Sequence, residues 1–83
     1  MKERQCQKTL FADRHGRMWV LERKQIRTPV TNTFKSYDDL LPMELVGLWN
    51  LALESNLPQE EFLCKYGGKK LFLACRRAAF DAL

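Results

Sequence analysis

The pattern of apolar residues changes at Ser36, and this change constrains the fold more than any other feature of the sequence. Before Ser36, short segments rich in aromatic and β-branched residues alternate with turn residues, which is typical of strands. After Ser36, apolar residues recur at helical spacing. The chain has 83 residues, enough for a single domain over 1–83 with a thin core. The sequence therefore predicts an α+β fold in which strands come first and helices follow.

Two extended segments, 7–12 and 17–23, are predicted to pair as a β-hairpin. The loop 13–16 between them begins with aspartate and ends with glycine, residues that close turns and accept a positive φ. A third segment, 26–34, also alternates and is predicted to be extended. Because Pro29 lacks an N–H, this third segment is expected to be an edge strand or a loop.

Two or three helices are predicted after Ser36: one over 43–56, one from Pro58 to a stop at Gly67–Gly68, and one over 69–82. The first is apolar nearly all round, since ten of the fourteen residues at 40–53 are apolar. A helix of this kind must be covered on several sides, and a chain this short has little material to do so. A homodimer is therefore expected. Its candidate interface residues are Leu45, Leu48, Trp49 and Leu53.

Charge is unevenly distributed along the chain, whose net charge is +4. Residues 1–35 hold nine basic and three acidic residues, residues 36–64 hold six acidic and none basic, and residues 65–83 hold five basic and one acidic. A net positive charge favours acidic partners, nucleic acid first among them. Alternatively, the blocks of opposite charge pair with each other within the fold or across a dimer.

The three cysteines, Cys6, Cys64 and Cys75, suggest reduced thiols and a cytoplasmic location, because their number is odd and residues 1–10 do not resemble an export signal. Cys64 and Cys75 fall within apolar helical patterns and are predicted to be buried and unreactive, whereas Cys6 is expected to be exposed. Together with His15 they could supply four zinc ligands, but without the usual paired spacing. No metal site or cofactor is expected.

An enzyme is not expected either. General acid–base chemistry needs a positioned histidine or carboxylates with shifted pKa values, and the only histidine, His15, lies in a predicted turn. The sequence has no nucleophile-elbow, metalloprotease or phosphate-loop motif. The longest apolar stretch, 40–53, is shorter than the roughly 20 residues that span a bilayer, so membrane insertion is not expected. The sequence thus favours a binding function.

A protein-binding surface is predicted on the segment 17–23. Arg17, Trp19 and Arg23 share one face of a strand there, and tryptophan and arginine dominate interface energetics. The alternative is that Trp19 packs under the helices. Small basic chains of this kind are typical of accessory proteins of bacteriophages or mobile elements, which often bind and disable a host protein. The leading hypothesis is a non-enzymatic regulator or inhibitor that contacts an acidic protein surface.

A second hypothesis is DNA binding, because residues 57–68 resemble the first helix and turn of a helix-turn-helix unit. Gln59, Phe62, Tyr66 and Gly67 match that motif, and Leu73 matches the apolar anchor of its second helix; Leu63, Gly68 and Arg76 depart from it. The resemblance implies a transcriptional regulator whose second helix enters the major groove. The residues it would place near phosphates or bases are Lys69, Lys70, Arg76 and Arg77. The alternative is an ordinary helical hairpin with a solvated basic face.

Overall fold

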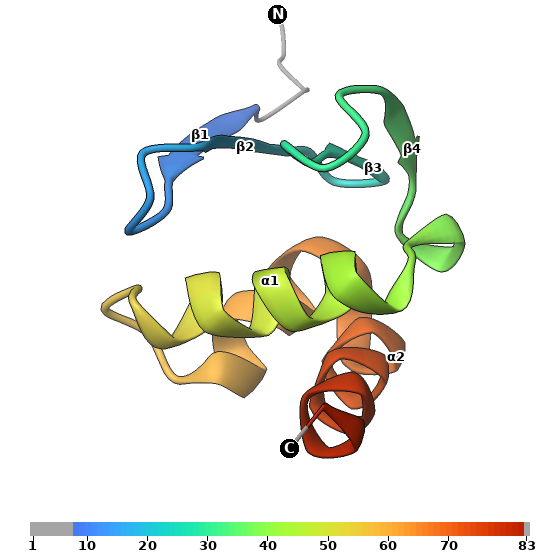
Figure 1. Ribbon diagram of the computed structural model, residues 1–83. Coiled ribbons are helices and arrows are strands. Elements are labelled where there is room, and N and C mark those ends of the chain that lie inside the picture. Colours follow the sequence, from blue (N-terminus) through green and yellow to red (C-terminus); the bar gives the residue numbers. More distant parts are fainter. Residues whose placement is uncertain (1–7, 83) are drawn as a thin grey trace, which may run out of the picture.

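The structure, a computed structural model that describes residues 8–82, has two layers: a four-stranded antiparallel sheet and helices that cover one of its faces (Figure 1). The strands lie in chain order and each is antiparallel to the next. This arrangement confirms the predicted α+β fold. The elements are β1 (Thr9–Ala12), β2 (Met18–Leu21), β3 (Gln25–Arg27), β4 (Phe34–Ser36), a 3-10 turn η1 (Tyr37–Asp39), α1 (Pro42–Leu53) and α2 (Gln59–Asp81).

The predicted hairpin is present as β1 and β2, with Phe11 opposite Trp19. The prediction of one extended segment over 26–34 is wrong, because the chain reverses after β3 and returns as β4. Pro29 cannot donate to a sheet ladder, and Asn32 adopts a φ of 59° while its N–H donates to the Thr28 carbonyl at 2.9 Å. Pro29 and Asn32 therefore form the turn of a second hairpin, β3–β4, in the segment predicted to be an edge strand or a loop.

The core lies between the inner face of the sheet and the helices. Trp19, Leu21 and Ile26 point inward from β2 and β3 and are 0–1% exposed. The backbone of α1 comes close to Trp19 at Gly47, where a Cβ atom would lie 2.8 Å from the indole Cη2. Glycine at this position therefore lets the indole pack flush against the helix. The helices contribute Leu48, Leu51, Ala52, Phe62, Leu63, Tyr66, Leu71 and Cys75 to the same core.

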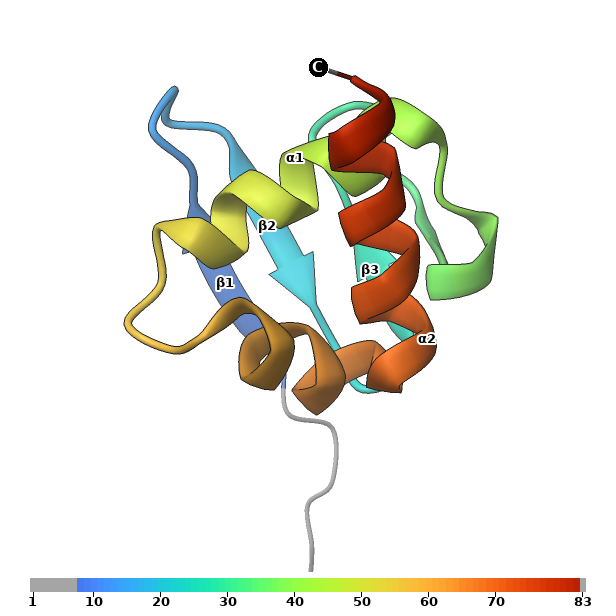
Figure 2. The same ribbon diagram turned by 90° about the horizontal axis from the view of Figure 1, so that it is seen from below.

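A sharp break divides α2 at Gly68, whose φ of 76° and ψ of −177° are accessible essentially to glycine alone. The segments before and after Gly68 run in clearly different directions (Figure 2). The predicted helix stop at Gly67–Gly68 is thus confirmed. The kink lets α2 bury side chains from both of its segments under the sheet and α1.

The chain itself covers much more of α1 than the sequence indicated. Leu51 is 3% exposed, and Leu48 is completely buried. The sheet covers one side of α1 and α2 covers another (Figure 1). Leu48 is therefore wrong as a dimer contact. Leu45 and Trp49 are half-buried and Leu53 is exposed, so these three remain candidates.

The two described cysteines are free thiols with different environments. Cys75 is completely buried, and burial raises the pKa of its thiol to about 12. Cys64 is only half-buried, so the prediction of its burial is wrong. The reason is that Phe62, Leu63 and Tyr66 define the buried side of this helical segment. Cys6 lies outside the described residues.

Candidate functional site

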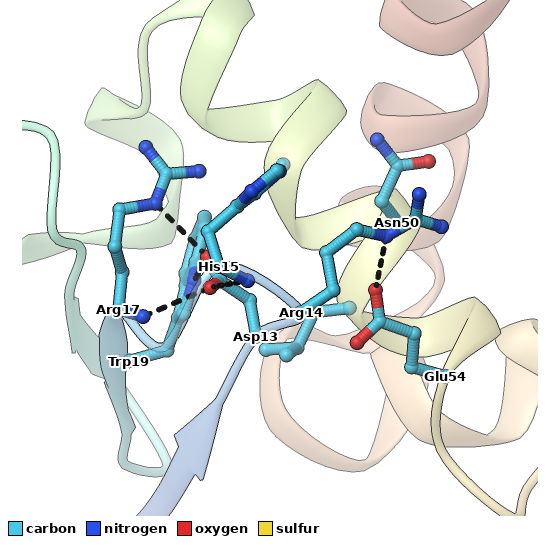
Figure 3. A pocket seen from close by; sticks show the side chains of 9 residues that line it. Asp13, Arg14, His15, Arg17, Trp19, Asn50 and Glu54 are labelled. Carbon is cyan, nitrogen blue, oxygen red and sulfur yellow. Dashed lines mark hydrogen bonds and ion pairs between the residues drawn. The ribbon is translucent and has the colours of Figure 1, made fainter.

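A pocket of about 230 Å³ lies between the β1–β2 loop and the C-terminal half of α1 (Figure 3). The loop side presents polar and basic groups, and the helix side adds an amide and a carboxylate. This arrangement brings the only histidine of the chain next to two acidic residues. The pocket is lined by Asp13, Arg14, His15, Arg17 and Trp19 from the hairpin, and by Gly47, Asn50, Leu51 and Glu54 from α1.

Asp13 organises the loop side of this pocket. Its Oδ1 accepts hydrogen bonds from the backbone N–H groups of His15 and Arg17, each at 2.9 Å. Its Oδ2 accepts from the Trp19 indole Nε1 and from the Arg17 Nε, each at 3.1 Å. The carboxylate therefore closes the turn, as its position in the sequence predicts, and also fixes the indole beneath it.

Burial of the Asp13 carboxyl raises its pKa, but the hydrogen bonds from Trp19, Arg17 and His15 outweigh burial and lower the pKa to about 2. A general base works best with a pKa near the operating pH. Glu54, the other carboxylate, lies 3.4 Å from the Arg14 Nε. Within residues 8–82, no hydrogen bond joins the His15 imidazole to either carboxylate. Asp13 thus acts structurally, as the centre of the hairpin turn.

We expect the stability of the folded protein to fall at acid pH because the Asp13 carboxylate becomes protonated. Because its folded-state pKa of about 2 lies below the ordinary value of 3.8, ionised Asp13 stabilises the fold above about pH 3.8. This contribution is lost as the pH falls from 3.8 towards 2. Thermal unfolding at stepped pH should show a steeper loss of midpoint in the wild type than in Asp13→Asn. Parallel curves for the two proteins would contradict the assignment.

The predicted protein-binding set Arg17, Trp19 and Arg23 does not form one exposed face. Trp19 is 1% exposed, so the alternative that it packs under the helices is correct and its role as a surface anchor is wrong. The strand β2 ends at Leu21, and Arg23 lies in the following turn, where strand alternation no longer applies. Arg17 is exposed and paired with Asp13.

The predicted DNA-contacting residues Lys69, Lys70, Arg76 and Arg77 are all exposed on α2. Three of them lie near acidic groups: Lys69 at 3.7 Å from Glu60, Lys70 at 3.4 Å from Asp38, and Arg77 at 4.0 Å from Asp81.

The helix-turn-helix resemblance is weaker in three dimensions than in sequence. Leu73, which the motif requires as a packed anchor, is 47% exposed. Only Gly68 separates the two helical segments of α2, whereas the motif uses a turn of about three or four residues. Phe62 and Tyr66 are buried as the motif requires. The second segment is instead held to the core by Leu71 and Cys75, so Leu73 faces outward.

Sequence reasoning missed a cluster of exposed apolar side chains where α1 and α2 meet. Leu53, Leu73 and Phe80 are 59%, 47% and 61% exposed. Leu53 follows Trp49 by four residues on α1, and Leu73 precedes Phe80 by seven on α2, so each shares a helix face with one of the clustered rings. The rings of Trp49 and Phe72 join the two helices, with centroids 6.0 Å apart. The i, i+4, i+8 spacing of Phe72, Arg76 and Phe80 is the signal that could have revealed it. We call the cluster the helical patch; it comprises Trp49, Leu53, Phe72, Leu73, Arg76, Ala79 and Phe80.

A small pocket of about 130 Å³ opens in the helical patch, lined by Trp49, Arg76, Ala79 and Phe80. The Arg76 guanidinium carbon lies 5.7 Å from the centroid of the Phe80 ring, in a cation–π arrangement. The patch therefore combines a recess of apolar side chains with a cation at its edge.

Comparison of the chain with known protein families, with curated proteins and with solved structures finds no match. Among residues 8–82, neither helix is long and apolar enough to cross a membrane. The same part of the chain contains no group of three or more histidine, cysteine, aspartate or glutamate residues placed to hold a metal ion. The geometry of the surface is therefore the guide to function.

Proposed function

We propose that the protein is a non-enzymatic regulator or inhibitor, acting in the cytoplasm, that binds a partner protein through the helical patch. The observation that carries this proposal is the exposure of Leu73 and Phe80 on α2, where Phe80 lines a pocket with Trp49 and Phe72 pairs with the Trp49 ring. Single exposed apolar side chains are common on proteins, but apolar side chains gathered in one place mark interaction sites.

The composition of the patch indicates the chemistry of its partner. Aromatic residues and arginine supply most of the binding energy in protein interfaces. The pocket between Trp49 and Phe80 is large enough for one apolar side chain, and Arg76 and the exposed Arg77 can donate charge-assisted hydrogen bonds to carboxylates. The partner surface is therefore an apolar anchor flanked by aspartate or glutamate.

A displayed library of random peptides, selected on the immobilised protein, tests the proposal. Enriched peptides should carry an aromatic or aliphatic residue beside acidic ones. Their affinity should fall by at least about tenfold for the double variant Leu73→Ala, Phe80→Ala, because each loses contact area at the centre of the patch. Leu10→Ala is the matched control, since Leu10 is as exposed as Phe80, at 61%, but lies on the sheet.

Two results would overturn the proposal. One is a set of enriched peptides that bind the double variant as tightly as the wild type. The other is a dimer in light scattering that Phe80→Ala dissociates, because a second copy of the chain would then occupy the patch instead of a different partner. The thermal midpoint of the double variant should stay near that of the wild type, since both side chains are exposed.

A further inference from the structure

The face of the sheet that points away from the helices forms a second unpartnered surface. Successive side chains of a strand point to opposite faces, so Met18 lies on the face opposite Trp19. Figure 1 shows both helices on the inner side of the sheet only. On the outer face, Leu10, Met18 and Phe34 are 61%, 47% and 41% exposed. This face carries no helix and is partly apolar, and its neighbouring side chains cover Val20 at the centre, which is 2% exposed.

Basic side chains lie among these apolar ones. Arg27 stands between Val20 and Phe34 in the strand register. Its guanidinium carbon lies 5.6 Å from the centroid of the Phe34 ring, and the Lys8 Nζ lies 5.9 Å from the same centroid. A guanidinium stacked on an aromatic ring keeps its N–H groups free to bind a phosphate in the plane of the guanidinium.

The whole sheet layer carries a strong excess of positive charge. Residues 8–36 contain seven basic and two acidic residues. One of the acidic residues, Asp13, already accepts four hydrogen bonds inside the hairpin turn, and the other, Glu22, is half-buried. Among the basic residues, Lys35 is paired with the buried Glu44. The remaining exposed or half-exposed cations are Lys8, Arg14, Arg17, Arg23, Lys24 and Arg27.

We infer that the outer face of the sheet binds single-stranded nucleic acid. Unpaired bases offer flat faces that can lie against Phe34, Leu10 and Met18, while Arg27 and Lys8 bind the adjoining phosphates. A duplex keeps its base faces stacked inside and cannot make these contacts. A lipid bilayer would have to take Arg27, in the middle of the face, into its apolar region, which is costly. This surface and the helical patch lie on different layers. A result that overturns nucleic-acid binding by the sheet therefore does not overturn protein binding by the helical patch, and the reverse also holds.

Fluorescence anisotropy of a labelled oligothymidine of about 12 nucleotides, and of the oligouridine of the same length, tests the inference. Both should bind at low salt. Arg27→Ala should weaken binding and flatten the slope of log K against log salt by about 0.7, because one phosphate contact is lost. Phe34→Ala should weaken binding about tenfold through loss of one stacking platform. Lys65→Ala, on the exposed surface of α2 and outside both proposed binding surfaces, is the matched control and should change affinity less than about twofold.

The thermal midpoint of each variant is measured beside its affinity. If Phe34→Ala lowers that midpoint, the affinity is measured with the variant Phe34→Leu in its place. Leucine keeps an apolar side chain on β4 but has no ring. No anisotropy change at low salt would overturn the inference. So would an affinity for duplex DNA equal to that for the single strand, equal effects of Arg27→Ala and Lys65→Ala, or binding to phosphatidylserine vesicles without binding to either oligonucleotide.

Discussion

Replacing Trp19 with alanine is expected to lower the free energy of unfolding by about 3–5 kcal/mol, the range for large aromatic side chains removed from cores. Trp19 is 1% exposed, packs against α1 at Gly47, and donates its indole N–H to Asp13 at 3.1 Å. The substitution removes the packing and also takes a donor from the Asp13 carboxylate. Equilibrium unfolding in urea measures the change. An unaltered denaturation midpoint would mean that Trp19 is not part of the core.

Two further variants separate the contributions of the indole. Trp19→Phe keeps a ring in the core but has no N–H for Asp13, so it should cost less than Trp19→Ala. Gly47→Ala should destabilise the wild type, because the new Cβ would lie 2.8 Å from the indole. In the Trp19→Ala background the same change should be harmless or stabilising, since alanine favours a helix over glycine by about 1 kcal/mol. Additive effects would contradict a direct contact between the two positions.

Replacing Glu44 with alanine is expected to destabilise the protein by about 3–5 kcal/mol, because it leaves a buried network without its acceptor. Glu44 is completely buried at the start of α1. Its Oε1 accepts from the Lys35 Nζ and from the backbone N–H of Leu41, each at 2.9 Å. Its Oε2 accepts from the hydroxyls of Thr28 and Thr31. One carboxylate thus ties the β3–β4 hairpin to the first turn of α1.

The control for this prediction is Glu44→Gln, which keeps the shape and one acceptor but removes the charge. It should cost less than Glu44→Ala, and a further Lys35→Met change should recover part of the loss because no unpaired cation then remains near the core. Burial raises the pKa of Glu44, but the hydrogen bonds from Thr28, Leu41 and Lys35 outweigh it and lower the pKa below its usual value. Equal urea midpoints for Glu44→Ala and the wild type would contradict the network.

The sequence alone determined that strands precede helices, and it determined two of the chain's turning points. Asp13 and Gly16 marked the β1–β2 turn because the aspartate carboxylate bonds to N–H groups two and four residues on, and Gly16 accepts a φ of 77°. Gly67–Gly68 marked the break in α2 because the backbone there adopts angles open to glycine. These features are local, so the residues that cause them stand next to one another in the sequence.

Only the tertiary structure decided which sides of those elements are covered. Both faces of β2 carry apolar residues, so alternation could not show that Trp19 lies inward and Met18 outward. The burial of Glu44 depends on Thr28 and Lys35, which come from a hairpin that the sequence did not predict. The helical patch exists because the kink at Gly68 turns Leu71 and Cys75 into the core and leaves Phe80 outside. Periodicity identifies the faces of an element, but burial depends on contacts between residues far apart in the chain, and these are fixed only when the layers pack.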